Sequence, residues 1–140
     1  MRDMSARELV SRYVAVWTEP DAELRRKAIQ ERWAEDGAHI LQPPQEIRQA
    51  AAGLGFPSAT LQARGHDELE ARVTRSYQDF VAPGQFTFKA RDNADRLHNV
   101  VKFTWDMVPA GGGEAAGTGL EILVLDEDGR IEADYQFIET

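Results

Sequence analysis

The chain has 140 residues and no cysteine, and its 24 acidic and 16 basic side chains give a net charge of −8. A chain of about this length usually forms one domain without a disulfide or metal, so we expect a single domain over residues 1–140. The missing cysteines exclude thiolate nucleophiles, cysteine-bound zinc and disulfides. The negative charge argues against nucleic acid as a partner, because it repels phosphate groups.

The distribution of apolar residues argues against secretion and against a membrane. The N-terminal stretch MRDMSARELVSRY lacks the continuous apolar segment of a signal peptide. No window approaches the roughly 20 apolar residues that are needed to span a bilayer. We therefore expect a cytoplasmic protein that has no membrane as a partner.

Two helices are predicted at the start of the chain. Ser5 and Glu8 form a capping box, which starts the first helix. The second helix opens at the TEPD segment of 18–21, with Thr18 as its cap. It carries Trp33 inward and ends at Asp36-Gly37.

A short strand and a third helix follow. AHILQ at 38–42 is apolar and short enough for a strand, and Pro43-Pro44 ends it. A third helix is predicted from about residue 66 to residue 80, with its apolar residues on one stripe. We interpret 45–63 as an irregular loop or short helix, whose length suits a lid or an entrance.

The rest of the chain favours strands at 85–90, 97–108, 118–125 and 130–138. Helices that precede such strands and cover one face of an antiparallel sheet make an α+β domain. The last two strands are apolar on both faces, and a second subunit usually covers the free apolar face of a sheet. We therefore expect a homodimer formed through the sheet.

The known motifs for phosphate and metal binding are missing. The GGG of 111–113 lacks the strand before it and the helix after it that a phosphate-binding loop needs, which makes it a hairpin loop. The three histidines, His39, His66 and His98, are widely separated and show no metal-ligand spacing. We predict no metal site and no cofactor.

Four segments together resemble a known superfamily. They are SRY with the following Trp17 in the first helix, WAEDG, RLHNVVKFTW, and the closing GLEILVLDEDGRI with YQFIE. In this order they resemble the SnoaL-like branch of the nuclear transport factor 2-like superfamily. The resemblance implies a cone-shaped α+β fold, in which a curved antiparallel sheet wraps about three N-terminal helices around an internal pocket. It also implies dimers through the sheet, but it does not choose among isomerases, epoxide hydrolases, polyketide cyclases and binding domains.

The resemblance to ketosteroid isomerases is partial. It implies Tyr13 as an oxyanion donor and Glu121 as a second donor, in the strand before the DEDGRI turn. A carboxylic acid in an apolar pocket keeps its proton, because burial raises its pKa. The position of the isomerase base matches Leu41, which cannot accept a proton, so steroid isomerisation by that mechanism is not expected.

The chain lacks the catalytic residues of the epoxide hydrolases in this superfamily but has a carboxylate of the kind that its polyketide cyclases use. The Arg and Asp residues of the epoxide hydrolases correspond to Leu97, Asn99 and Gln136, so that machinery is absent. SnoaL-type polyketide cyclases need one acid/base carboxylate in a hydrophobic pocket, and the acidity of the substrate does much of the work. Glu121 or Asp134 meets that need.

The sequence does not determine which face of the last hairpin points into the cone. Glu121 lies between Leu120 and Ile122, so alternation alone allows it to point outward. Asp134 and Gln136 share one face of their strand; if that face is convex, Tyr135 and Phe137 point inward instead. If it is concave, a polar cluster lies within an apolar cup: Asn99, Glu121, Asp134 and Gln136.

We assign the candidate site on the concave interpretation. The candidate catalytic residues are Glu121, Asp134 and Tyr13. The candidate ligand-binding residues, several of them also core residues, are Trp17, Trp33, His39, Leu41, Asn99, Val101, Phe103, Trp105 and Gln136. Aromatic walls suit a flat hydrophobic ligand, and His39 is a candidate proton carrier.

Three functions remain possible for such a site. The first is an isomerase, cyclase or hydratase that acts on a hydrophobic carbonyl or polyketide-like molecule. The second is a ligand-binding or accessory domain without chemistry. The third is an interaction scaffold, which requires a cone filled by its own side chains.

Overall fold

The computed structural model describes residues 4–43, 45–55 and 61–139. Its helices are α1 (Ala6–Thr18), α2 (Ala22–Arg32), α3 (Gln45–Gly53), α4 (Gly65–Ser76) and the π-helical turn η1 (Tyr77–Val81). Its strands are β1 (Trp33–Leu41), β2 (Leu61–Arg64), β3 (Phe86–Ala90), β4 (Asp95–Leu97), β5 (Val100–Pro109), β6 (Gly117–Leu125) and β7 (Ile131–Ile138). None of the described helices is both long and apolar enough to cross a bilayer.

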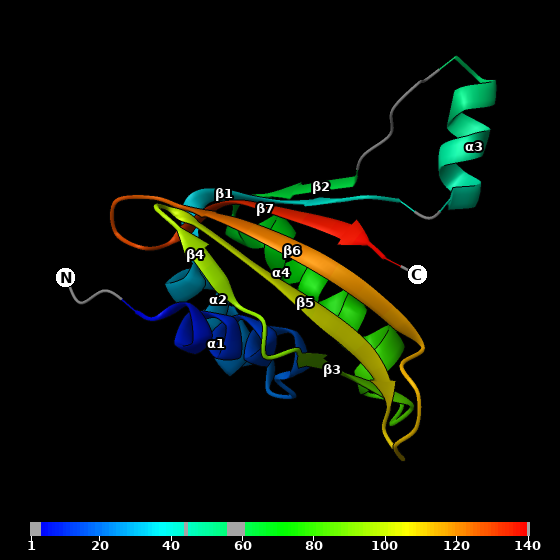
Figure 1. Cartoon of the computed structure of the whole chain (residues 1–140), viewed down its shortest axis with the longest axis horizontal. Coiled ribbons are helices and arrows are strands. Elements are labelled where there is room, and N and C mark those ends of the chain that lie inside the picture. The colour runs from blue at the N-terminus through cyan, green and yellow to red at the C-terminus, as the bar shows by residue number, and fades with distance from the viewer. Residues whose placement is uncertain (1–3, 44, 56–60, 140) are drawn as a thin grey trace.

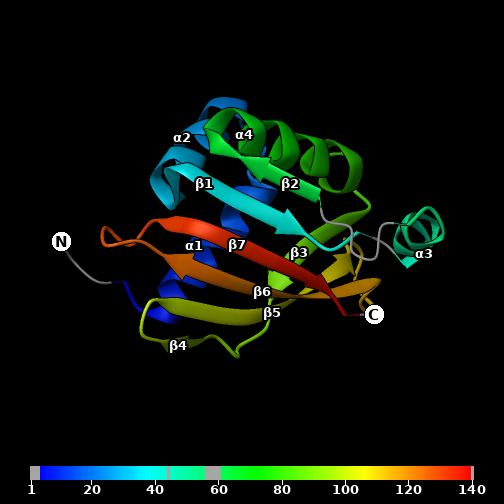
Figure 2. The ribbon, with the colours of Figure 1, turned by 90° about the horizontal axis from the view of Figure 1, so that it is seen from above.

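The strands form one curved sheet, with α1, α2 and α4 on its concave side (Figures 1 and 2). The strand order is β2-β1-β7-β6-β5-β3, and β4 pairs with β5. The expected α+β architecture is therefore confirmed, but the sheet is mixed rather than wholly antiparallel, since β1 and β7 run parallel. Parallel strands need a long crossover connection between them, and the chain between β1 and β7 contains helices that supply it.

The first strand is longer than predicted. It starts at Trp33, which was expected at the end of the second helix, and not at residue 38. Its register with β7 shifts between Trp33 and Ala38. Gly37 lies in this bulge, where a Cβ atom would stand 2.6 Å from the carbonyl oxygen of Ile131. The two backbones approach so closely here that only glycine fits.

The helix starts agree in part with the prediction. The Ser5 hydroxyl accepts a hydrogen bond from the Glu8 backbone N–H at 3.1 Å, as a cap does. Thr18 does not cap α2, because it is the last residue of α1. Asp21 takes that role and accepts from the Leu24 backbone N–H at 3.0 Å.

Three short elements differ from the predicted pattern. The 45–63 stretch contains α3, which projects from the body and has no buried residue, and the first residues of β2 (Figure 1). Residues 56–60 of that stretch lie outside the described residues. The predicted strand 97–108 is divided: Leu97 ends β4 and is exposed, His98 turns the chain with φ 54°, and β5 begins at Val100.

The core lies between the three packed helices and the concave face of the sheet. It contains the buried side chains Leu9, Val10, Tyr13, Val16, Ile29, Trp33, Ala63, Leu69, Val73, Val101, Phe103, Leu123, Leu125 and Ile131. Among these apolar residues the structure also buries Arg25, His39, Glu121 and Asp134. Buried ionisable groups are rare, and three of these four gather at one place.

Candidate functional site

The register of the β6–β7 hairpin places the acids inside. Glu121 is 1% exposed and Asp134 is 0% exposed, whereas Tyr135 and Phe137 are 40% and 41% exposed on the convex face. Glu121 pairs with Gln136 across the two strands. The concave alternative of the two predicted registers is therefore the one that the structure adopts.

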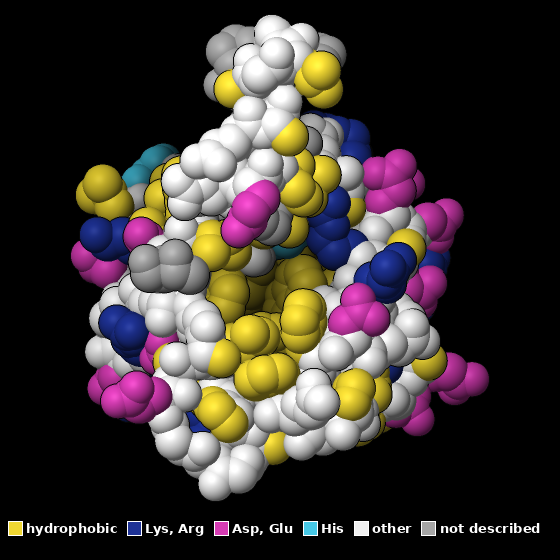
Figure 3. All heavy atoms as spheres, turned by 90° about the vertical axis from the view of Figure 1, so that its right-hand side faces the viewer, with side chains coloured by type: hydrophobic (Ala, Val, Ile, Leu, Met, Phe, Trp, Pro, Cys, Tyr) yellow, Lys and Arg dark blue, Asp and Glu magenta, His cyan; other side chains and the backbone are white. Residues whose placement is uncertain are grey.

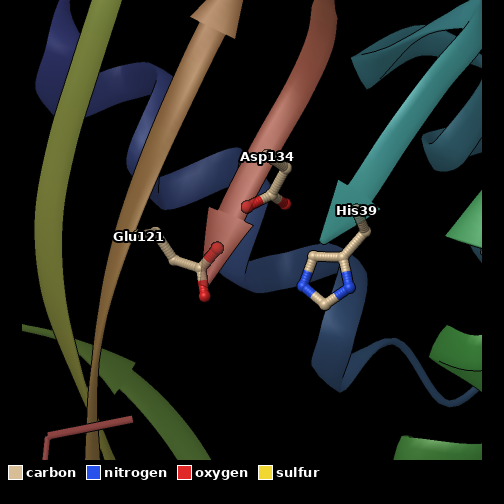
Figure 4. A group of neighbouring side chains, drawn as sticks. All are labelled: His39, Glu121 and Asp134. Carbon is tan, nitrogen blue, oxygen red and sulfur yellow. The ribbon is translucent and has the colours of Figure 1, made fainter. Parts of the chain in front are cut away.

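Tyr13 links the two acids. Its hydroxyl donates to Asp134 Oδ2 at 2.5 Å and lies 3.2 Å from Glu121 Oε2. The other oxygen of Glu121 accepts from the Trp105 indole N–H at 2.9 Å. Asp134 Oδ1 has no hydrogen-bond partner among the described residues. Figure 4 shows Glu121, Asp134 and His39 pointing into the same space from β6, β7 and β1.

Burial decides the protonation of this cluster. It raises the pKa of Glu121 well above 4.5, and the nearby charge of Asp134 and a hydrogen bond with it add to the rise. Bonds from Trp105 and Tyr13 oppose the rise without reversing it. Burial, followed by the charges of Asp134 and Glu121, also raises the pKa of the Tyr13 phenol. Glu121 and Tyr13 therefore hold their protons near neutral pH, and Asp134 accepts the short bond from the Tyr13 hydroxyl.

His39 belongs to a second set of contacts beside the acids. Its Nδ1 lies 3.0 Å from Arg72 Nη1, and its Nε2 lies 2.9 Å from Gln136 Oε1. A guanidinium can only donate, so Nδ1 accepts and the single proton of the neutral ring is on Nε2. Burial lowers the pKa of His39 and keeps the ring neutral, although the Asp134 charge acts in the opposite direction.

The same contacts decide whether the cluster suits a metal ion. One ligand atom each from His39, Glu121 and Asp134 lies within 4.8 Å of the others. A histidine ligand gives a ring nitrogen to the metal and donates its other N–H to an acceptor. Here Arg72 faces Nδ1 as a donor, so Nε2 carries the proton and has no lone pair to offer. The three residues do not fit a metal while Arg72 is in place.

A small cavity opens in front of Glu121. Its volume is about 60 Å³, which accommodates a few groups of the size of a water molecule. Its lining residues are Tyr13, Val14, Trp17, Ser76, Phe88, Trp105, Glu121 and Gln136. The face of the molecule that carries α3 is hollowed, and apolar side chains line the hollow (Figure 3).

The candidate residues fall into three groups around this cavity. Tyr13, Trp17, Trp105, Glu121 and Gln136 line it. Asp134, His39, Trp33 and Phe103 lie behind the lining; the rings of Trp33 and Phe103 stand 5.6 Å from that of Tyr13. The remaining three, Leu41, Asn99 and Val101, do not line it.

Those three have other surroundings. Asn99 stands next to the first residue of β5, where its amide donates to the Leu125 carbonyl oxygen at 3.3 Å. Val101 is a core residue. Leu41 pairs with Gln136 and is half-buried. Asn99 is thus not part of the polar cluster that the concave alternative implied.

Four residues of the site were not predicted. Phe88 and Val14 could have been found from the sequence. Phe88 follows the apolar alternation of the predicted strand 85–90, and Val14 lies next to Tyr13 on α1. Ser76 and Arg72 share a helical face with Leu69 and Val73, but a serine and an arginine on a helix are usually solvent-exposed. For Arg72 the sequence gives no sign of its contact with His39.

Comparison with known proteins gives structural likeness only. No family model and no curated protein matches the sequence. A proposed isomerase of the SnoaL-like family from Agrobacterium tumefaciens has a TM-score of 0.74 at 23% identity, over 94% of this chain and 95% of that one. A SnoaL-like protein of unknown function from Burkholderia thailandensis has 0.66 at 16%, over 99% and 100%. An NTF2-like protein of unknown function from Mesorhizobium loti has 0.63 at 17%, over 100% and 97%.

At identities this low, structural likeness establishes the fold and leaves the activity open. The three solved structures match nearly the whole chain. The chain has the cone-shaped α+β fold of the SnoaL-like and NTF2-like proteins.

Proposed function

We propose that the protein binds a small, hydrophobic carbonyl compound and isomerises or cyclises it by acid/base chemistry. One observation carries this proposal: Glu121, a buried acid whose pKa is raised, faces a cavity with aromatic walls. Such an acid stays protonated near neutral pH, and its proton can turn from the hydrogen bond with Asp134 to a carbonyl oxygen. The flat walls of Trp17, Phe88 and Trp105 suit an unsaturated or ring-shaped body.

Glu121 acts as the general acid in this proposal. Its proton stabilises the negative charge that develops on the carbonyl oxygen when the adjacent carbon loses a proton. Burial and the charge on Asp134 sustain the protonated state of Glu121, and the bond from Tyr13 opposes it only in part. Of the residues that line the cavity, only Glu121 and Tyr13 ionise. Water therefore accepts the carbon proton, which favours acidic substrates such as 1,3-dicarbonyl compounds.

Deuterium exchange tests this chemistry directly. Ethyl 2-methylacetoacetate in D₂O exchanges its C2 proton through the enol, and NMR follows the loss of that signal. We expect Glu121→Gln to lower the protein-catalysed rate by about 10² to 10⁴-fold, the usual contribution of a general acid. Glu132→Gln, which changes an exposed carboxyl on β7, is the matched control. Equal rates for the wild type and Glu121→Gln would contradict the proposal.

A binding protein without turnover is the second candidate. It is favoured by Leu41, which occupies the position of the isomerase base in the resemblance, and by Arg72, which occupies the lone pair of His39. Both leave β1 without a free base beside the cavity. Native mass spectrometry separates the two: a ligand that is retained unchanged supports binding alone, and conversion excludes it.

We further propose that the protein forms a homodimer through the convex face of the sheet. That face carries the exposed rings of Tyr135 and Phe137 beside the half-buried Leu120 and Ile122 of β6. An apolar surface of this kind on a soluble protein usually contacts another chain. A second copy fits it, because closed two-fold dimers are the commonest oligomers.

A further inference from the structure

The contacts between α4, β1 and β7 join three polar side chains in a row. Arg72 Nη1 lies 3.0 Å from His39 Nδ1, and His39 Nε2 lies 2.9 Å from Gln136 Oε1. Only Gln136 of these three lines the cavity. The row therefore runs from the outside of the cone to the wall of the candidate site.

Each member of the row fixes the next. Arg72 is held in place because its Nη1 also donates to the backbone oxygens of His39 and Leu61, at 3.0 and 3.1 Å. Since Arg72 has no acceptor atom, His39 Nδ1 must accept and Nε2 must donate. The atom of Gln136 that receives this proton must be its oxygen, so the orientation of the amide follows from chemistry alone. The ring of Trp17, 5.1 Å from that of His39, packs against the imidazole.

The Gln136 oxygen is engaged by His39, so the amino group of the Gln136 side chain remains as a hydrogen-bond donor. It has no hydrogen-bond partner among the described residues. Since the Gln136 oxygen faces His39, which does not line the cavity, the amino group is the polar end that the side chain can present to it. Glu121 pairs directly with Gln136 across the strands, and such neighbours have Cβ atoms about 5 Å apart. One ligand atom can therefore contact both side chains.

We infer that Arg72 and His39 are positioning residues that turn the Gln136 amide N–H into the cavity as a hydrogen-bond donor. Paired with the acid proton of Glu121, it selects ligands that present an acceptor-only oxygen, such as a ketone. The inference rests on the proposed function, since it names the chemical group that the proposed ligand places at this end of the cavity. It adds specificity residues to that site and assigns no proton transfer to His39.

The tautomer of His39 tests the positioning step without any ligand. In protein labelled with ¹⁵N-histidine, long-range ¹H–¹⁵N spectra distinguish the two neutral tautomers and the imidazolium. We expect a single Nε2–H tautomer in the wild type, a mixture of tautomers in Arg72→Met, and recovery in Arg72→Lys, which keeps a donor. An Nδ1–H tautomer or an imidazolium in the wild type overturns the inference. The wild-type spectrum decides this even if Arg72→Met fails to fold.

A pair of probes tests the donor step. Cyclopentanone and methylenecyclopentane have the same shape, but only the ketone carries an acceptor. NMR titration of the wild type should show the ketone binding about tenfold more tightly, as expected for net hydrogen bonds in a partly dry site. Gln136→Met and Arg72→Met should each lower that preference by about threefold or more.

The outcomes separate this inference from the proposed function. Equal binding of the two probes, or a preference that Gln136→Met leaves unchanged, overturns the donor role while ligand binding stands. Binding of neither probe overturns the ligand class and speaks against the proposed function as well. Loss of exchange activity in Glu121→Gln, together with an Nδ1–H tautomer of His39, would support the proposed function and overturn the inference.

Discussion

The two faces of the β6–β7 hairpin differ in a direction opposite to that of most surface hairpins. The concave face buries Glu121 and Asp134, while the convex face of the same strands exposes Tyr135 and Phe137. A hairpin that only completes a core would place its apolar rings inside and its carboxyls in water. The fold instead accepts the cost of burying two acids, which amounts to several kcal/mol for an unpaired charge.

This inversion separates two roles of one hairpin. On the concave side, Tyr13 and Trp105 partly compensate the buried acids, and the remaining polar groups are available to a ligand. On the convex side, the exposed rings belong to the proposed dimer interface. Polarity, and not burial alone, therefore marks which face serves each proposed role. Each face can be disturbed separately.

The largest effect is expected on the convex face. Phe137→Asp places a charge in the proposed dimer interface and should weaken dimerisation about a thousandfold, since burying an unpaired charge costs about 4 kcal/mol. Sedimentation equilibrium measures this against the wild type. Leu54→Asp, at an exposed apolar position beyond α3, is the control and should leave the dimer intact. A wild type that is monomeric at high concentration would contradict the proposed interface.

On the concave face, the strongest disturbance is Tyr13→Phe. It removes the hydroxyl that donates the short bond to the buried Asp134 Oδ2, while Asp134 Oδ1 already has no partner among the described residues. We expect the free energy of unfolding to fall by about 3 kcal/mol, as measured by urea denaturation. In an Asp134→Asn background the same change should cost less, because the amide carries no charge to leave unpaired. Equal costs in both backgrounds would show that Tyr13 acts through packing alone.

The fold was largely predictable, since hydrophobic periodicity marks long elements. The stripes of α1 and α4 and the alternation of β5, β6 and β7 are visible in the sequence. The elements of three or four residues, β4 and β2, carry too few residues for a pattern. The parallel pairing of β1 with β7 depends on where the crossover helices pack, and Trp33 was placed in a helix because its apolar side chain suits both structures.

The site was predictable up to one choice. Alternation put Asp134 and Gln136 on one face, but both faces of the hairpin are apolar enough to be buried, so the sequence could not say which is concave. The resemblance to ketosteroid isomerases favoured Glu121 inside, and the structure places it there. The role of Arg72 could not be predicted from the sequence, because its contact with His39 joins residues that are 33 positions apart and lie on different elements.

A glycine on β6 tests how the Trp105 wall is held. A Cβ atom at Gly119 would lie 2.1 Å from the Trp105 ring, so the indole, which donates to Glu121, occupies the space beside this backbone. Gly119→Ala should push the ring aside, break that bond and lower the free energy of unfolding by about 2 kcal/mol. Gly117→Ala is a matched control two residues earlier, where the nearest atom is 3.8 Å away. Equal stability of the two variants would show that Trp105 adapts.

The smallest effect concerns the pH dependence of stability. Burial and then the charge of Asp134 raise the pKa of Glu121 above 4.5, so the folded protein binds a proton that the unfolded chain releases. This contribution is complete below pH 4.5 and is lost as the pH rises through the raised pKa. His39 has the opposite sign: burial lowers its pKa below 6.5, so its contribution is present above pH 6.5 and is lost in acid.

Between pH 6.5 and about 10, the ordinary pKa of a tyrosine, the slope therefore reports Glu121 within this cluster. The free energy of unfolding of the wild type should fall by up to about 1.4 kcal/mol for each pH unit over which the folded protein holds the extra proton. Glu121→Gln cannot release that proton, so its stability should stay nearly flat over the same range, while Glu132→Gln keeps the wild-type slope. A flat profile in the wild type would mean that Glu121 ionises freely in the folded protein, and the polar face of the hairpin would then hold two charges and no general acid.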